Sequence, residues 1–136
     1  FGAIVSCEKQ QACKDLRQLD EETYAWLKLL AFENGHVVLK GFDALEPKEM
    51  ENAARNFGPL LKWKFGYTFH VTPKENPETT VDSRGITPYH WDGMFYHTVP
   101  AFQLFQCVRA PPKGYGGQTT FIQTKRIINW LNETEQ

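Results

Sequence analysis

The first 58 residues alternate between short apolar segments and longer segments whose apolar residues recur with a helical period. Residues 1–5 and 36–40 are short and apolar, which predicts two strands. Between them, Asp20 is a good N-cap and Gly35, which follows an asparagine, is a stop signal, so we expect a helix across this interval. The apolar face of this helix is formed by Tyr24, Leu27, Leu30 and Ala31.

A second helix is expected to begin at Pro47. Proline suits the first turn of a helix, and Gly58 followed by Pro59 ends it. Its apolar residues are Met50, Ala53, Ala54 and Phe57. The opening of the chain is therefore predicted to be β-α-β-α, which indicates an α/β (α+β) fold with helices packed against a sheet.

The remainder of the chain is predicted to be mostly β. Residues 60–69, 89–92, 101–108 and 118–122 have strand character, and a final helix begins near Thr124 with Ile127, Ile128 and Leu131 on one side. In the first of these segments the aromatic residues recur at the two-residue period of a strand: Trp63, Phe65, Tyr67 and Phe69. Residues 72–84 are polar and contain two prolines, which predicts a loop of the kind that covers a site.

Composition limits the classes of function. With 136 residues, 15.7 kDa and 41% hydrophobic residues, the chain is expected to form a single domain over residues 1–136 with a large apolar interior. The net charge of −1, without a basic stripe, argues against nucleic acid and favours a small-molecule substrate. No apolar run reaches the roughly 20 residues of a membrane helix, so no membrane partner is expected. A homo-oligomer is left open.

The cysteines and the first residues bear on location. Cys7, Cys13 and Cys107 form no Cys-x-x-Cys pair, and an odd number is a poor disulfide framework. Residues 1–5 lack the basic flank and long apolar core of a signal peptide. We therefore expect a cytoplasmic location.

His90 and Asp92 lie two positions apart in a segment predicted as a strand. Because side chains alternate between the two faces of a strand, the imidazole and the carboxylate would point to the same side. These are two of the three protein ligands in non-haem Fe(II) oxygenases, which leave the other metal positions open. A His and an Asp at this spacing also hydrogen-bond to each other or to backbone, so the pair alone leaves both interpretations open.

The surrounding sequence follows an ordered pattern. The segments TPYHWDGMF at 87–95, VPAFQL at 99–104, APP at 110–112 and GGQTTF at 116–121 follow a Phe-Gly-Ala opening and a helix ending in Asn-Phe-Gly at 56–58. Together they resemble the taurine dioxygenase-like (TauD/TfdA) family of Fe(II)/2-oxoglutarate oxygenases over essentially the whole chain. Within it, residues 90–95, 98–103 and the Trp-x-x-Gly at 63–66 are similar to PvcB-type oxygenases, which process an isonitrile derived from an aromatic amino acid.

The resemblance implies a double-stranded β-helix, a cupin-like jelly roll with flanking helices, that is incomplete in this chain. It makes His90 and Asp92 catalytic iron ligands and Thr119 a hydroxyl donor to the distal carboxylate of 2-oxoglutarate. A turn hydroxyl that bonds to backbone is the ordinary alternative for Thr119. The implied enzyme uses Fe(II), 2-oxoglutarate and O2. It desaturates or hydroxylates an amino-acid-derived isonitrile in secondary metabolism, releasing succinate and CO2.

Two parts of the family pattern have no counterpart in this sequence. The second histidine ligand and the arginine that pairs with 2-oxoglutarate come later in the family, so the chain corresponds to the N-terminal half of such a domain and is expected to be inactive alone. His36, His70 and His97 are in the wrong places, and each is expected to be a surface or core histidine. Arg109 and Arg126 do not occupy the expected arginine position either. Related halogenases replace the carboxylate ligand with a small residue, so Asp92 argues against halogenation.

Substrate contacts are expected from the residues near this motif. The candidates are Phe65, Tyr67, Tyr89, Met94 and Phe95, whose side chains would suit an aromatic substrate, although most aromatic clusters are simply core. Arg84, between the predicted loop and the motif, is either solvated or paired with an anionic group of the substrate.

Three alternatives remain open from the sequence. One alternative is a dioxygenase of the same family whose substrate is an amino acid, a sulfonate or another small carboxylate. Another is a non-catalytic jelly-roll remnant, which the missing His and Arg would explain. A zinc hydrolase built on the same His and Asp has no visible third ligand or general base. An unclosed jelly roll would expose strand edges, so a free-standing 136-residue chain is expected to aggregate.

Overall fold

The computed structural model describes residues 1–7 and 14–134. The chain divides into two compact units, one formed by Phe1–Leu45 with Phe105–Gln136 and the other by Glu46–Leu104.

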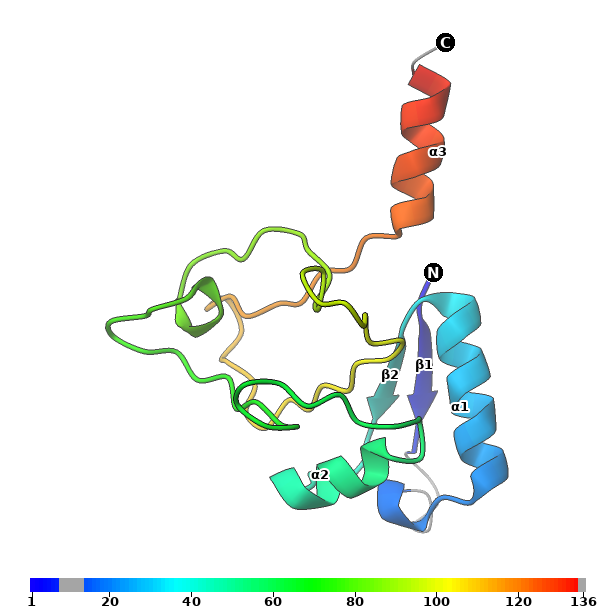
Figure 1. Cartoon of the computed structure of the whole chain (residues 1–136). Coiled ribbons are helices and arrows are strands. Elements are labelled where there is room, and N and C mark those ends of the chain that lie inside the picture. The colour runs from blue at the N-terminus through cyan, green and yellow to red at the C-terminus, as the bar shows by residue number, and fades with distance from the viewer. Residues whose placement is uncertain (8–13, 135–136) are drawn as a thin grey trace. The chain divides into compact units, whose positions relative to one another are not determined.

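The first unit contains a parallel β-α-β arrangement. Strand β1 (Ala3–Ser6) pairs with strand β2 (Val37–Lys40) in a register that joins Ala3 to Val37 and Ser6 to Lys40. A parallel pair needs a crossover connection, and helix α1 (Glu21–Asn34) belongs to it and lies beside the two strands (Figure 1). The predicted strand-helix-strand opening is therefore confirmed, with strand limits shifted by one or two residues.

The ends of α1 are set by the residues that the sequence singles out. The Asp20 side chain caps the helix by accepting a 2.8 Å hydrogen bond from the backbone N–H of Thr23. At the other end Gly35 is the C-cap, and its N–H donates to the carbonyl of Ala31. Tyr24 and Leu27, both from the predicted apolar face, are buried. The helix thus anchors the small core of this unit.

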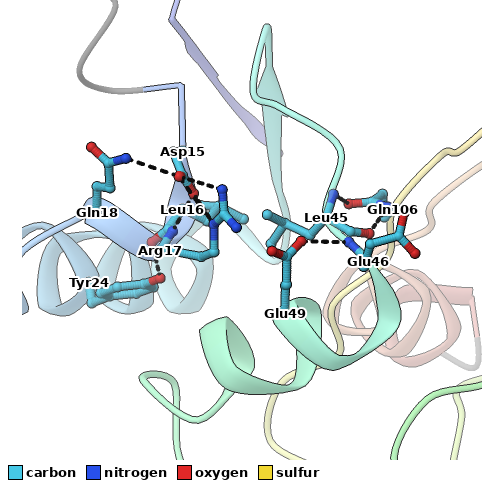
Figure 2. Close-up of polar contacts among 9 residues, drawn as sticks. All are labelled: Asp15, Leu16, Arg17, Gln18, Tyr24, Leu45, Glu46, Glu49 and Gln106. Carbon is cyan, nitrogen blue, oxygen red and sulfur yellow. Dashed lines mark hydrogen bonds and ion pairs between the residues drawn. The ribbon is translucent and has the colours of Figure 1, made fainter.

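A short 3-10 helix, η2 (Leu16–Gln18), precedes α1 and is organised by Asp15. The Asp15 carboxylate accepts hydrogen bonds from the backbone and side chain of Arg17 and from the side chain of Gln18 (Figure 2). The Tyr24 hydroxyl donates to the carbonyl of Leu16, so η2 is held against α1. The sequence predicted only a polar stretch here.

Gln106 joins its segment to the residues after β2. Its side-chain amide accepts from the N–H of Leu45 at 2.8 Å and donates to the Leu45 carbonyl at 2.9 Å (Figure 2). The glutamine amide thus bonds to both the N–H and the carbonyl of one residue, as the backbone of a neighbouring strand would. Residues 101–108 were predicted to be a strand, and they are not one here.

In the second unit, helix α2 (Pro47–Ala54) begins as predicted. Pro47 occupies the first turn, and Glu46 and Glu49 form a capping box in which the Glu49 carboxylate accepts from the Glu46 N–H at 3.0 Å (Figure 2). The helix ends earlier than expected, and turns carry the chain through Phe57 to Gly58.

Four predicted strands are not formed in the described part of the chain. Residues 60–69, 89–92, 101–108 and 118–122 are loops and turns there, apart from an isolated antiparallel bridge between Trp63 and Gly66. An alternating pattern shows that one face is apolar, but a strand also needs a paired backbone on at least one side. The predicted α/β class is confirmed in its coarser form, whereas the jelly-roll strands are not seen among the described residues, whose one sheet is β1–β2.

The final helix, α3 (Thr124–Thr134), is confirmed, with Thr124 as its first residue. Its apolar side chains Ile127, Ile128, Trp130 and Leu131 are exposed. Of the helices that the structure describes, none has the length and apolar character needed to cross a membrane.

The cysteines differ from the expectation drawn from their odd number. Cys7 is buried and disulfide-bonded, whereas Cys107 is exposed and free. Cys13 lies outside the described residues.

We predict that Tyr24→Phe lowers the free energy of unfolding by about 1 kcal/mol, because the carbonyl of the buried Leu16 loses the hydroxyl donor and keeps only the 3.4 Å hydrogen bond from the N–H of Leu19. The measurement is urea denaturation of the full-length gene product that carries this chain. Tyr115→Phe makes the same chemical change at a side chain that is 82% exposed, and it should be close to neutral. Equal losses in the two variants would contradict this role of the Tyr24 hydroxyl.

Asp15 gives a prediction about pH. The hydrogen bond from the Arg17 side chain, with a second from its backbone, lowers the pKa of Asp15 from 3.8 to about 2. A lowered carboxylate pKa stabilises the fold above pH 3.8, and this contribution is lost as pH falls through about 2. Asp15→Asn should therefore reduce stability at neutral pH and flatten the decline between those two values. Urea midpoints from pH 2 to 7, with the exposed Asp43→Asn as control, test this; parallel curves would refute it.

Candidate metal and cofactor site

A tight turn in the second unit carries the His-x-Asp motif. Residues 92–95 form the turn, and the N–H of Tyr96 donates to the carbonyl of Gly93 at 3.0 Å. Gly93 is buried with φ +80, and a Cβ there would lie 2.7 Å from Cδ of Pro100. Only glycine fits this position without a shift of backbone or proline. The predicted strand at 89–92 is wrong: Asp92 begins the turn, and His90 lies two positions before it.

His90 and Asp92 do converge, as the sequence predicted. Nε2 of His90 lies 3.2 Å from Oδ1 of Asp92, and the two side chains are 44% and 32% exposed. Two ligand atoms on neighbouring positions of an octahedral cation, each about 2.1 Å from it, lie about 3 Å apart. The pair therefore has the spacing of two ligands, which is also the spacing of an ordinary ion pair.

The contact of the other ring nitrogen of His90 bears on the choice between a metal-ligand pair and an ordinary ion pair. Nδ1 lies 2.8 Å from the carbonyl oxygen of Pro88, which can only accept a hydrogen bond, so we assign the proton of the neutral ring to Nδ1. Nε2 then presents a lone pair to the Asp92 oxygen. Two lone pairs at 3.2 Å repel unless a positive charge lies between them, either a proton or a metal cation. Metal-binding histidines commonly show this pattern, with the second nitrogen bonded to a carbonyl.

Gln103 holds the second oxygen of the carboxylate. Its side-chain amide donates to Oδ2 of Asp92, which leaves Oδ1 directed to His90. Gln103 belongs to the family-like segment at 99–104, but no role was predicted for it from the sequence. Its separation of 11 positions from Asp92 carries no periodic signal, so only the folded loop shows the contact.

Thr119, the predicted 2-oxoglutarate contact, belongs to the other unit and lies in an exposed loop. The glycines before it have positive φ, and a Cβ on Gly117 would lie 2.7 Å from Cγ of Pro111. The backbone thus explains a glycine two positions before the threonine. The cofactor role of Thr119 remains a prediction.

The five candidate substrate contacts are all exposed, with fractions of 42% for Phe65, 44% for Tyr67, 67% for Tyr89, 43% for Met94 and 90% for Phe95. Phe65 packs between two other rings, whereas the Arg55 guanidinium lies 5.7 Å from the ring centre of Tyr67. Their contact with a substrate remains a prediction.

Residues 72–84 form the predicted loop, which includes the short helix η3 (Thr80–Asp82). Nζ of Lys74 lies 2.8 Å from Oδ2 of the buried Asp82, and this hydrogen bond raises the pKa of Lys74. The loop lines a pocket of about 310 Å³ with Lys74, Glu75, Pro77 and Arg84. Arg84 is exposed there, which fits a solvated side chain or an anion contact.

The other histidines were expected not to bind metal. His36 stacks on Phe121 with ring centres 4.3 Å apart and meets Phe1 edge-on, so it is a packed histidine as predicted. His70 and His97 are exposed. In the described part of the chain, no group of three or more His, Cys, Asp or Glu could hold a metal ion.

The imidazole of His90 and the oriented carboxylate of Asp92 are two of the donor types found in mononuclear non-haem iron oxygenases, whose centres combine nitrogen and oxygen ligands. Comparison with known proteins makes this more specific. Residues 7–136 match the model of the family described as "Taurine catabolism dioxygenase TauD, TfdA family". The chain belongs to this family.

Named relatives support the finer resemblance. The chain is 38% identical over 128 residues to "3-((Z)-2-isocyanoethenyl)-1H-indole synthase" of Fischerella ambigua, covering 94% of this chain and 45% of that protein. It is 36% identical over 129 residues to "Tyrosine isonitrile desaturase" of Erwinia amylovora, covering 94% and 42%. A more distant relative is human "Gamma-butyrobetaine dioxygenase", 28% identical over 101 residues, with 74% and 26% covered.

The chain thus spans less than half the length of the curated relatives it matches. No solved structure matches it.

Proposed function

We propose that the protein is an Fe(II)/2-oxoglutarate-dependent oxygenase that desaturates or hydroxylates an amino-acid-derived isonitrile, with release of succinate and CO2. Membership of the taurine dioxygenase family supports the reaction class. The names of the two relatives at 36–38% identity support an isonitrile substrate.

The observation that carries this proposal is the close approach of the His90 imidazole to the Asp92 carboxylate. Nδ1 of His90 is directed to the Pro88 carbonyl, so Nε2 and Oδ1 of Asp92 face each other, and either a proton or a metal cation between them would offset the repulsion of their lone pairs. An imidazole nitrogen and a single carboxylate oxygen suit Fe(II). Iron bound there would supply open positions for 2-oxoglutarate and O2.

The remaining roles are part of the same proposal. Thr119 would donate its hydroxyl to the distal carboxylate of 2-oxoglutarate. The third metal ligand and the 2-oxoglutarate arginine would come from sequence equivalent to the part of the relatives that this chain does not match. Residues 1–136 would then contribute the N-terminal half of one jelly-roll domain, whose further strands would pair with segments that are loops here. A cytoplasmic location and a homo-oligomer stay open predictions.

A second candidate keeps the chemistry and changes the substrate. Gamma-butyrobetaine dioxygenase is also a relative, at 28% identity, which leaves another small carboxylate or amino acid as the alternative. The higher identity and coverage of the isonitrile enzymes favour the first candidate.

We predict a visible charge-transfer band when the full-length gene product is mixed anaerobically with Fe(II) and 2-oxoglutarate, and we expect His90→Ala to abolish it. His97→Ala is the matched control, because it removes an exposed imidazole seven positions away and should leave the band intact. Full-length protein that gives no band, or a band that survives in His90→Ala, would reject the oxygenase proposal.

Gln103 provides a second prediction. Its amide fixes Oδ2 of Asp92, so Gln103→Ala should weaken Fe(II) binding about 10- to 100-fold without unfolding the protein. The comparison is Gln106→Ala, which removes the paired hydrogen bonds to Leu45. That variant should lower stability and leave the Fe(II) dissociation constant unchanged. Unchanged Fe(II) affinity in Gln103→Ala would show that the carboxylate needs no such support.

A further inference from the structure

A cluster of aromatic rings adjoins the His-x-Asp turn within the second unit. We define the aromatic cluster as Trp63, Phe65, Phe69 and Tyr96. The ring centres of Trp63 and Tyr96 are 4.6 Å apart, those of Trp63 and Phe65 are 5.5 Å apart, and those of Phe65 and Phe69 are 4.5 Å apart. The rings thus form a continuous series with Trp63 and Phe65 in the middle.

The cluster is joined to the candidate metal site through Tyr96. Tyr96 directly follows the turn at 92–95, and its N–H donates to the carbonyl of Gly93, the residue after Asp92. The position of the Tyr96 ring against Trp63 therefore depends on the same turn that directs the carboxylate.

The backbone also fixes the middle of the cluster. Trp63 and Gly66 exchange two hydrogen bonds, of 2.8 and 3.0 Å, which close a tight turn with Phe65 inside it. Gly66 has φ +108, a conformation that side-chain-bearing residues rarely adopt. Phe65 is therefore presented by a closed turn rather than by a free loop.

These rings contact one another without becoming buried. Phe65 is 42% exposed, Phe69 is 45% exposed and Tyr96 is 44% exposed. Burial of such a side chain stabilises a protein by about 1.5–3 kcal/mol, so rings that stay half exposed leave apolar area for another apolar group. An aromatic ring that enters such a cluster gains offset-stacked and edge-to-face contacts, each worth about 0.5–1.5 kcal/mol beyond burial.

Tyr67 is in the same stretch of sequence and is not part of the cluster. Its ring faces the Arg55 guanidinium, at the C-cap of α2. The predicted set of substrate contacts is thereby divided, because Phe65 belongs to the cluster and Tyr67 has a cationic neighbour. Trp63, Phe69 and Tyr96 were not among the predicted contacts.

We propose that the aromatic cluster of Trp63, Phe65, Phe69 and Tyr96 binds the aryl ring of an aromatic amino-acid-derived isonitrile and sets the preference for aryl over aliphatic substrates. This inference rests on the proposed function. The cluster supplies mainly ring contacts. Its hydrogen-bonding groups are the Tyr96 hydroxyl and the Trp63 indole N–H. It therefore determines which side chain is accepted, and the chemistry remains at the metal centre.

The test measures binding of two probes to the full-length gene product loaded anaerobically with Fe(II) and 2-oxoglutarate. The probes are the isonitriles derived from tyrosine and from valine, and binding is followed by the change in the charge-transfer band. Tyr96→Leu and Phe65→Leu should each raise the dissociation constant of the tyrosine-derived probe about tenfold and leave that of the valine-derived probe nearly unchanged. Phe32→Leu, at an exposed ring of α1, should change neither.

The charge-transfer band distinguishes failure of the proposed oxygenase function from failure of the proposed role of the aromatic cluster. Wild-type protein without a band rejects the oxygenase function and this inference with it. A normal band in both variants, with unchanged binding of the tyrosine-derived probe, rejects the role of the aromatic cluster and leaves the oxygenase function standing. Equal weakening of both probes also rejects it, because a general structural effect does not distinguish the side chains. Two variants are used because either substitution alone could disturb the turn that it lies in.

Discussion

The hydrogen bond from Nδ1 of His90 to the carbonyl of Pro88 is the interaction on which the candidate site depends. It assigns the ring proton to Nδ1 and leaves Nε2 as an acceptor that faces a second acceptor on Asp92. Without this bond the ring could present an N–H to the carboxylate, and the pair would be complete by itself. With it, Nε2 of a neutral ring faces a carboxylate oxygen, and either a proton or a metal cation between the two atoms would offset the repulsion of their lone pairs.

The orientation of the Asp92 carboxylate is also set by a small number of contacts. Gln103 donates to one oxygen of Asp92, so the other oxygen is the one that faces His90. The turn that follows is possible because Gly93 adopts φ +80 beside Pro100. Three unlike devices therefore act on two side chains: a backbone acceptor, a side-chain donor and a glycine. Each of them lies within the Glu46–Leu104 unit.

Local chemistry explains which elements could be predicted from the sequence. Asp20, Gly35 and Pro47 act through contacts within a few residues, and each marks the end of a helix where it was expected. The predicted strands at 60–69 and 118–122 failed because alternation reports an apolar face and says nothing about whether a partner backbone is present. For the β1–β2 pair, a crossover that contains α1 brings that partner into place.

In the candidate site, too, features that depend on local sequence were predictable, and contacts between distant residues were not. His90 and Asp92 were recognisable because their spacing and residue types suit a metal and the surrounding segments resemble the taurine dioxygenase-like family. Their orientation was not predictable: the expected strand is absent, and the two side chains meet although His90 lies before the turn and Asp92 lies in it. Gln103, 11 positions from Asp92, and Gln106, 61 positions from Leu45, contribute through contacts with no periodic signature.

The aromatic residues show why a pattern can be correct in composition and wrong in structure. Rings at every second position from 63 to 69 would line one face of a strand, and in the folded chain they are distributed between two surroundings. Phe65 and Phe69 join Trp63 in the aromatic cluster, whereas Tyr67 faces Arg55. A strand would have presented all four rings to one neighbour. The turn closed by Trp63 and Gly66 separates them, and so a periodic sequence yields a small number of rings placed beside the residues proposed to hold the metal.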